Sequence, residues 1–387
     1  MSFNAYAKSN GTARMMALVL AFVALFGFSA FGQEVTGSIT GSVVDPSGAA
    51  IPNAKLEVTG ANLPQTLVST SGSTGSYAFS NVPAGSYVVT ATVTGFSTMK
   101  KTDVNVVLGR STQLNFKLEV GQVTESVVVS ADAVMVDTTT SASSVNVDKS
   151  FFDLLPKGRS FYDLAAIAPG ARAEGKTGGV QVDGASGSEN TFFIDGMEVT
   201  NIQTGVLSNK NRIPVEMVQQ TQIKNGVMEA QYGGAMGGVI SAVVRSGSND
   251  FHGQAGFYFN NDEMAGRPRD SLRLDPFNEA RGEYFRNEAD DYTRWNPVFN
   301  IAGPIMRNKL FFFTGFMPTK QVTNRDVTFN VDGKTRSFKQ NDFQHYMTNK
   351  LDFMPFTKLR TSASWTWNPG YVQGILPGRG EIGRAHV

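Results

Sequence analysis

The sequence predicts a mainly β protein with three folded parts: a small β-sandwich, a mixed α/β domain, and the first strands of an incomplete transmembrane β-barrel. Glycine (40 residues) and phenylalanine (28 residues) are both abundant in the 387-residue chain. That pairing suits tight turns and aromatic-rich strands better than a helical protein. Short alternating apolar and polar runs fill residues 35–120, and longer alternating runs follow Phe251. These two patterns indicate a sandwich followed by longer strands, and a soluble sandwich would show the same alternation as a barrel in the second region.

The composition excludes several classes of site. The net charge is +1, so no global field indicates a nucleic-acid partner. The chain has no cysteine, which excludes disulfides, thiolate metal sites and cysteine nucleophiles. Its three histidines, His252, His345 and His386, lie far apart and lack ligand spacing. We therefore expect no metal, no cofactor and no bound nucleic acid.

Residues 1–32 have the features of a secretory signal peptide. Lys8 and Arg14 precede an apolar core, which is followed by small residues up to Gly32. The core is too short and too rich in glycine for a comfortable membrane span, although a membrane anchor is the alternative. The mature protein is therefore expected to leave the cytoplasm.

Residues 35–120 are expected to form the sandwich. In "SYVVTATVTG", Val89, Ala91 and Val93 alternate with threonines, as in a strand with one buried face. The series "GSVVDPSGAAIPNAKLEV" and "TGSYAFSNVPAGSYVVTATVTGF" resembles the carboxypeptidase-regulatory-like domain. That resemblance implies a prealbumin-like, carbohydrate-binding-like fold with an accessory or binding role, and no peptidase activity.

The segment 121–250 is expected to form the mixed domain. A serine- and threonine-rich stretch at 137–144 is interpreted as a solvated linker, and apolar residues between Phe152 and Ile167 recur at helical spacing. "TFFIDGMEV" predicts two short strands joined at a tight Asp195-Gly196 turn. Residues 212–226 are expected to form a helix followed by a strand, or a strand alone.

A glycine-rich stretch, "QYGGAMGGVISAVVRSGSNDFHG", begins at Gln231. Gly233 and Gly238 have Walker spacing, but Val239 and Ile240 follow where a phosphate loop needs lysine and a hydroxyl residue. Gly233 and Gly237 have the spacing of a membrane helix-packing motif, but no apolar helix of about twenty residues surrounds them. We therefore expect these glycines to allow turns and close backbone approach, before a strand that ends in a polar loop.

Three further pieces resemble one family. "LPKGRSFYDLAAIAPG", "FFIDGMEV" and "IPVEMVQQTQIKNGVMEAQYGGAMGGVISAVVRSGSNDFHG" are similar in order and spacing to the plug domain of TonB-dependent outer-membrane receptors, and the whole arrangement is similar to the Oar-like subfamily. The resemblance implies a structural plug motif at Phe193, Ile194, Asp195, Gly196, Gly233, Gly234, Gly237 and Gly238.

Residues 251–380 are expected to begin the barrel. Phe257 and Phe259 alternate with Tyr258, and long and short connections alternate between the strands, as in outer-membrane barrels. A charged segment at 262–291 and a polar stretch at 320–340 are interpreted as loops. About five strands are counted, whereas plugged transporters have about 22, so the sequence is expected to be an N-terminal fragment. The last residues, 381–387, read "EIGRAHV", which matches a translated sequencing adapter, and we expect them to be an artefact.

The resemblance implies energised uptake across the outer membrane and no enzyme activity. The implied partners are the TonB energy-transducing complex in the periplasm, outer-membrane lipid, and an extracellular ligand that is a siderophore, a glycan or a peptide. The barrel would lie in the outer membrane and the sandwich in the periplasm. The alternative function is a secreted or surface β-rich adhesin or carbohydrate-binding protein.

In this family the TonB complex pulls on a short segment before the plug, which is called the TonB box. It works by adding a strand to its partner's sheet, so it should be apolar, β-prone and tethered. The matching residues are Glu125, Ser126, Val127, Val128, Val129 and Ser130. The alternative is that Val127 to Val129 are a strand of the plug or the sandwich.

Overall fold

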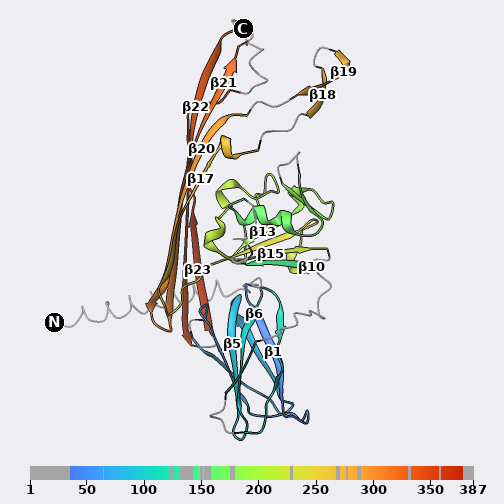
Figure 1. Ribbon diagram of the computed structural model, residues 1–387, viewed down its shortest axis with the longest axis vertical. Helices are drawn as coiled ribbons and strands as arrows, with labels where there is room; N and C mark the ends of the chain where they lie inside the picture. The colour runs from blue at the N-terminus through green and yellow to red at the C-terminus, as the bar shows by residue number, and fades with distance from the viewer. Residues whose placement is uncertain are drawn as a thin grey trace, which may run out of the picture. The chain divides into compact units, whose positions relative to one another are not determined.

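The structure is a computed structural model (Figure 1). It describes residues 35–63, 65–121, 126–130, 143–148, 151, 158–174, 179–226, 230–266, 271–275, 278–285, 289–329, 333–356 and 359–377. The predicted signal peptide, the predicted adapter segment and Glu125 lie outside the described residues. No helix in the part that the structure describes is long and apolar enough to cross a membrane.

Two sheets form the predicted sandwich. The first sheet contains β1 (Gly37–Val44), β4 (Ser76–Val82), β7 (Ser111–Gln113) and β8 (Phe116–Lys117). The second has the order β3 (Leu67–Thr70), β2 (Lys55–Thr59), β5 (Gly85–Thr92), β6 (Thr98–Val106) and β9 (Ser126–Ser130). Buried residues of β1, β2, β4, β5, β6 and β8 form one core, which includes the fully buried Leu56, Val89 and Phe116.

Two tyrosines fix the edges of this core. The hydroxyl of Tyr77 donates a hydrogen bond to the Leu114 carbonyl at 2.5 Å, and that of Tyr87 donates to the Pro83 carbonyl at 2.7 Å. Burial raises the pKa of both phenols well above the usual value, so both stay neutral donors under all ordinary conditions. Each ring fills the core while its polar tip is satisfied by backbone.

The middle domain, meaning the described residues between 143 and 244, is built on a five-stranded sheet. Its order is β10 (Ser143–Asp148), β15 (Val218–Asn225), β16 (Val239–Val244), β13 (Thr191–Ile194) and β14 (Met197–Glu198). A two-stranded sheet of β11 (Ala171–Ala173) and β12 (Val180–Val182) accompanies it. The expected linker at 137–144 therefore ends inside strand β10, and its residues 137–142 lie outside the described residues.

Short 3₁₀ helices supply the helical part of the middle domain. They are η1 (Phe161–Ile167), η2 (Gly187–Glu189), η3 (Asn209–Asn211), η4 (Val215–Met217) and η5 (Ala230–Tyr232). Ser160 begins η1 with a capping box to Asp163, and Phe161 and Leu164 are buried. The helical spacing predicted up to Ile167 is therefore present in its second half, while 152–157 lie outside the described residues. Of the two expectations for 212–226, helix followed by strand is correct, because η4 leads into β15.

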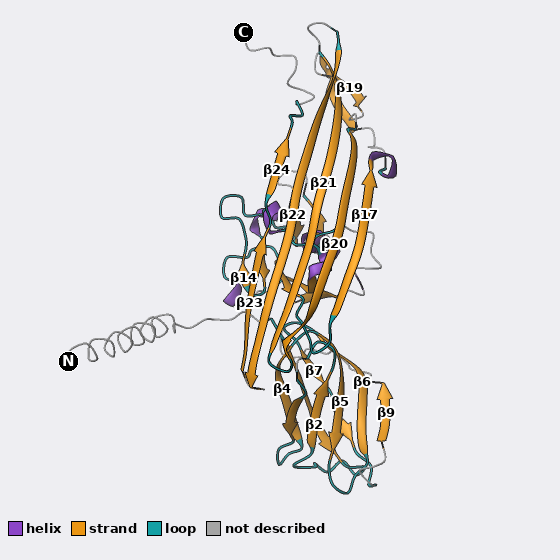
Figure 2. Cartoon of the chain, turned by 90° about the vertical axis from the view of Figure 1, so that its left-hand side faces the viewer, coloured by secondary structure: helices purple, strands orange, loops and turns teal. Residues whose placement is uncertain are grey.

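A third sheet, called the long sheet, follows directly from β16. Its strands β17 (His252–Asn261), β20 (Asp291–Met306), β21 (Leu310–Thr328), β22 (Thr335–Phe356) and β23 (Leu359–Trp367) are neighbours in chain order, and β24 (Gly370–Gln373) also pairs with β22 (Figure 2). All pairs are antiparallel. The described strands form an open sheet, as expected for part of a barrel.

Two expected loops contain strands. The polar stretch 320–340 belongs mostly to β21 and β22, which pair from Leu310↔Phe353 to Thr328↔Thr335. The charged segment 262–291 contains η6 (Asp262–Met264) and a hairpin of β18 (Ser271–Asp275) and β19 (Asn278–Phe285). Interpreting these stretches as loops was wrong because pairing satisfies the backbone of a polar strand whatever its side chains are. Apolar alternation is required only where a strand faces lipid or a core.

The two faces of the long sheet differ as predicted. On β20, Val298 and Ala302 are buried on one face, whereas Phe299 and Ile301 are 52% and 50% exposed on the other. On β17, Phe257 is likewise exposed while Tyr258 packs against the buried core. The exposed apolar face suits lipid, and the other face packs against the middle domain.

Candidate functional site

The turn between β13 and β14 sets the position of Asp195. Ile194 pairs with Met197, so Asp195 and Gly196 are the two turn residues, with φ angles of 48° and 80°. Both values lie in the left-handed region that an Asp-Gly hairpin turn requires. The Asp195 amide donates a hydrogen bond to the Ala242 carbonyl at 2.9 Å, so the turn is tied to β16.

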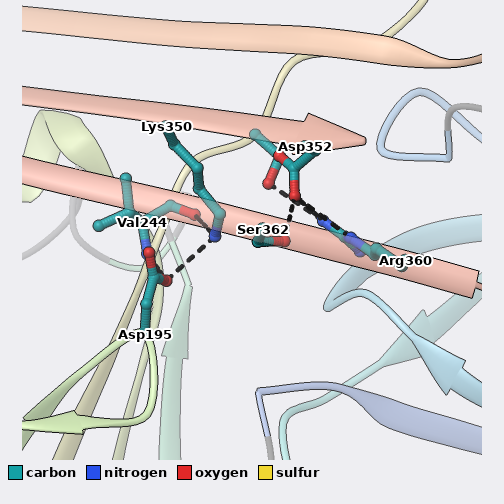
Figure 3. A network of polar contacts seen from close by, with 7 residues as sticks. Asp195, Val244, Lys350, Asp352, Arg360 and Ser362 are labelled. Atoms are coloured by element: carbon teal, nitrogen blue, oxygen red, sulfur yellow. Dashed lines mark hydrogen bonds and ion pairs between the residues drawn. The ribbon is translucent and has the colours of Figure 1, made fainter. Parts of the chain in front are cut away.

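Asp195 forms a buried ion pair with Lys350 of β22 (Figure 3). The Lys350 Nζ lies 3.0 Å from the Asp195 Oδ1 and also donates to the Val244 carbonyl at 3.2 Å. The same Oδ1 accepts the Val244 amide at 2.9 Å. The side chains of Lys350 and Asp195 are only 5% and 11% exposed. The pair therefore joins the middle domain to the long sheet at the end of β16.

Removing only one member of this ion pair is costly. Taking two charges out of water carries a desolvation penalty that their attraction and hydrogen bonds must offset. The second carboxylate oxygen, Oδ2, is buried without a hydrogen-bond partner in the described structure. The pair therefore contributes little net stability, but it makes a specific contact that requires both members.

A second charged group lies two residues further along the same face of β22. Asp352 is 2% exposed and accepts hydrogen bonds from Arg360 Nη2 at 2.9 Å and from the Ser362 hydroxyl at 2.6 Å (Figure 3). Arg360 also donates to the Ser246 hydroxyl at 3.3 Å. Ser246 belongs to the loop that connects β16 to β17, so this group holds that loop against β22 and β23.

A third contact joins the start of the middle domain to the first strand of the long sheet. Arg159 forms an ion pair with Glu216, whose side chain is 5% exposed. The guanidinium carbon of Arg159 lies 3.3 Å from the centre of the Tyr258 ring on β17. Stacking of a guanidinium on an aromatic face adds a cation–π attraction to the ion pair.

Close packing completes the interface. A Cβ added at Gly315 of β21 would lie 2.8 Å from the Met217 Cγ, so only glycine leaves room for that side chain. Met217 belongs to one buried apolar cluster together with Val298, Phe313 and Met317 of the long sheet. The interface therefore combines an apolar core with buried charged groups.

The predicted glycine motif lies elsewhere in the middle domain. Gly233 and Gly234 are exposed in a turn, and Gly234 has a φ of 96°. Gly237 and Gly238 are buried, and a Cβ on Gly237 would lie 2.5 Å from Asn190 Oδ1. The Gly238 amide donates to that same oxygen at 2.7 Å. These glycines act as turn and close-approach residues around Asn190.

The aromatic part of the motif packs beside the glycines. Phe193 is 3% exposed, and its ring centre lies 5.8 Å from that of Tyr232, in a small cluster with Val239. Ile194 points into the main core of the middle domain. Within the predicted motif, Asp195 forms an ion pair with Lys350 of the long sheet.

The candidate TonB box residues Ser126, Val127, Val128, Val129 and Ser130 form strand β9. This strand pairs in parallel with β6 of the sandwich, from Thr98↔Ser126 to Thr102↔Ser130. Val128 is 62% exposed. The segment is thus an edge strand of the sandwich sheet and is not near the Asp195–Lys350 pair in sequence or in any described sheet.

Sequence reasoning missed the long-sheet half of the site. Thr348, Lys350 and Asp352 alternate with the exposed Leu351 and Phe353 in "TNKLDF", so two charges fall on the inward face of a strand segment whose outward face is apolar. That spacing was the available signal, because inward charges on a barrel strand need partners. In the described residues, no three carboxylate, histidine or cysteine side chains gather as a metal site would require.

Three family models match the chain in order. The carboxypeptidase regulatory-like domain covers residues 38–119, the TonB-dependent receptor plug domain covers 136–239, and an outer membrane beta barrel domain covers 243–376. The chain belongs to the TonB-dependent outer-membrane receptors. The middle domain is their plug, and the long sheet is the part of the barrel that this chain contains.

Curated relatives agree with the assignment to this receptor family. The chain is 29% identical to the TonB-dependent transporter Oar of Myxococcus xanthus over 356 residues, which cover 86% of this chain and 32% of Oar. It is 33% identical to the ferrienterobactin receptor of Escherichia coli K12 over 88 residues, 20% of this chain and 12% of that receptor. The chain therefore spans about a third of the length of Oar and a smaller share of the ferrienterobactin receptor.

An outer membrane transporter of known structure also aligns with the chain. The outer membrane transporter YddB of Escherichia coli aligns with 59% of this chain and 33% of its own, at 14% identity and a TM-score of 0.47. This TonB-dependent receptor resides in the outer membrane, as its plug and barrel domains indicate.

Proposed function

We propose that the receptor imports a ligand across the outer membrane, driven by a partner that pulls on a periplasmic segment. The observation that supports this most is the interface between the plug and the long sheet. It combines buried charged contacts, whose residues come from both sides, with an apolar cluster that both sides share. In our proposal this interface holds the plug against the barrel strands at rest and separates without unfolding them.

The pull must come from outside the receptor. The outer membrane holds no ATP, so the energy has to arrive mechanically from the periplasmic side. In our proposal the partner is the TonB complex, and strand β9 is the segment it takes. An edge strand with an exposed valine at its centre suits strand addition, which uses backbone hydrogen bonds for affinity.

The ligand class stays open among a siderophore, a glycan and a peptide. The ferrienterobactin receptor is named for a siderophore, but its alignment covers only 20% of this chain. We propose no catalytic role, since the receptor family consists of transporters. No comparison with known proteins supports the secreted adhesin alternative. In our proposal the sandwich lies in the periplasm, on the side from which the pull comes.

The test is a proline in the centre of β9. Val128→Pro removes one backbone donor and prevents regular strand pairing, so uptake should fall to background while cell-surface binding stays at the wild-type level. Binding and uptake are measured in cells with three labelled probes: a ferric siderophore, an oligosaccharide and a peptide. Val128→Thr is the matched control, because it keeps the backbone donor and the β propensity, and it should behave as wild type. Uptake at the wild-type rate by the proline variant would refute β9 as the pulled segment.

A further inference from the structure

The sandwich docks on the plug through one turn. Leu108 lies between β6 and β7 and is fully buried. Its amide donates to the Gln220 Oε1 at 2.8 Å, and its carbonyl accepts the Gln222 Nε2 at 2.7 Å. Both glutamine side chains come from alternate positions of β15 and are 3% and 2% exposed. The backbone N–H and C=O of one buried sandwich residue are therefore both hydrogen-bonded by the plug.

An arginine of the same turn holds the neighbouring plug strand. The Arg110 Nη2 donates to the carbonyl of Ser144 at 2.9 Å and to its hydroxyl at 2.8 Å. Ser144 lies on β10, the edge strand of the plug sheet, and pairs there with Lys224 of β15. We call Leu108, Arg110, Ser144, Gln220 and Gln222 the clamp. The clamp joins the sandwich to β10, the plug strand that follows β9 in the chain, and to β15, the neighbour of β10 in the plug sheet.

The clamp is local. A polar cavity of about 390 Å³ lies beside it, lined in part by Asp103, Asp148 and Gln220. The clamp therefore combines the buried Leu108 side chain with hydrogen bonds at the edge of a polar cavity. Buried hydrogen bonds of this kind are expensive to leave unmade, which makes their loss easy to detect.

Strand β9 is connected to both the sandwich and the plug. Four residues (122–125) separate it from Gly121, whose amide is bonded to the Gly95 carbonyl of the sandwich. Twelve residues (131–142) separate it from β10 of the plug. The described contact of β9 is with the sandwich, because it pairs in parallel with β6.

We propose that the sandwich transmits force: a pull on β9 reaches β10 and β15 through β6 and the clamp. This assignment rests on the proposed function for its natural source of force. Strand β9 pairs with β6, which ends at Val106 immediately before the clamp turn. The pull is thus delivered to the two plug strands that the clamp holds.

This chain contains no cysteine, which allows a direct mechanical test. Val128→Cys introduces a thiol at an exposed position of the chain, to which a DNA handle is attached. The receptor that carries this chain is held by its barrel in a supported bilayer and pulled with optical tweezers. We expect a first rupture that opens the clamp.

Variants of the clamp decide the outcome. Gln220→Ala with Gln222→Ala, and separately Arg110→Ala, should lower the first rupture force at least twofold or remove that event. Gln219→Ala, the adjacent glutamine outside the clamp, should leave it unchanged. Equal first rupture forces in all four proteins would overturn the proposal. Heat-modifiable migration on a gel verifies that each variant is folded before it is pulled.

The same proteins separate this inference from the proposed function. The handle replaces the natural partner, so the mechanical result does not depend on TonB. One outcome is a lower first rupture force in the clamp variants together with ligand uptake at the wild-type rate by Val128→Pro. That outcome would support force transmission through the clamp and would refute β9 as the segment on which the natural partner pulls. Failure of the clamp effect together with lost uptake in Val128→Pro would overturn only the force path proposed here.

Discussion

At the residue scale, the Asp195–Lys350 pair is the contact through which the plug motif reaches the barrel. The Asp-Gly turn could be predicted from "IDGM" because its cause is local: two residues that tolerate positive φ between two apolar runs. The partner could not be predicted in the same way. Lys350 lies 155 residues further along the chain, and only the fold brings it within 3.0 Å of Asp195.

Removing one member of this pair should destabilise the receptor strongly. Asp195→Asn or Lys350→Gln leaves a buried charge without its partner, so each should lower the free energy of unfolding by about 3–5 kcal/mol. The double variant leaves two neutral amides and should recover part of that loss. The measurement is denaturant unfolding of the receptor in lipid vesicles, analysed as a double-mutant cycle.

An exposed ion pair is the control for this cycle. Lys55 and Glu57 of the sandwich lie 2.7 Å apart, but their side chains are 56% and 32% exposed. Lys55→Gln should change stability by less than about 1 kcal/mol. Strictly additive single variants at Asp195 and Lys350 would show that the two side chains do not interact.

At the element scale, the strands of the long sheet are longer than their apolar patterns. Strand β22 has 22 residues and β21 has 19, whereas alternation alone indicated about ten residues each. The apolar portion could be predicted because lipid on one face and the packed plug on the other both favour apolar residues there. The polar ends could not, since no side-chain pattern distinguishes a paired polar strand from a loop.

The exposed face of β20 should behave as a lipid-facing surface. Phe299→Arg places a charge among apolar neighbours and should cost about 2–4 kcal/mol if the residue lies near the bilayer midplane. Folding into vesicles, followed by heat-modifiable migration, measures the effect. Thr328→Arg, at the polar end of β21, is the matched control and should cost about 0–1 kcal/mol. Equal effects at both positions would show that Phe299 does not face lipid.

At the scale of the whole molecule, the order of domains could be predicted from the sequence, while the interfaces between them could not. The turn chemistry of the sandwich, the plug motif and the strand alternation are each local patterns. The clamp and the contacts between the plug and the long sheet join residues that are far apart in the chain, such as Leu108 and Gln222, which are 114 positions apart. Glutamines on a strand carry no sequence signal for the backbone groups that they bind.

The central claim is that the plug leaves the long sheet when the receptor is energised, and Met217 reports this most directly. Met217 is fully buried against Gly315 at rest, and the chain has no native cysteine. We predict that Met217→Cys is labelled by a maleimide in respiring cells, and that labelling falls at least tenfold with a protonophore or in the Val128→Pro background. Labelling that is equal in all three conditions would contradict an energised movement of the plug.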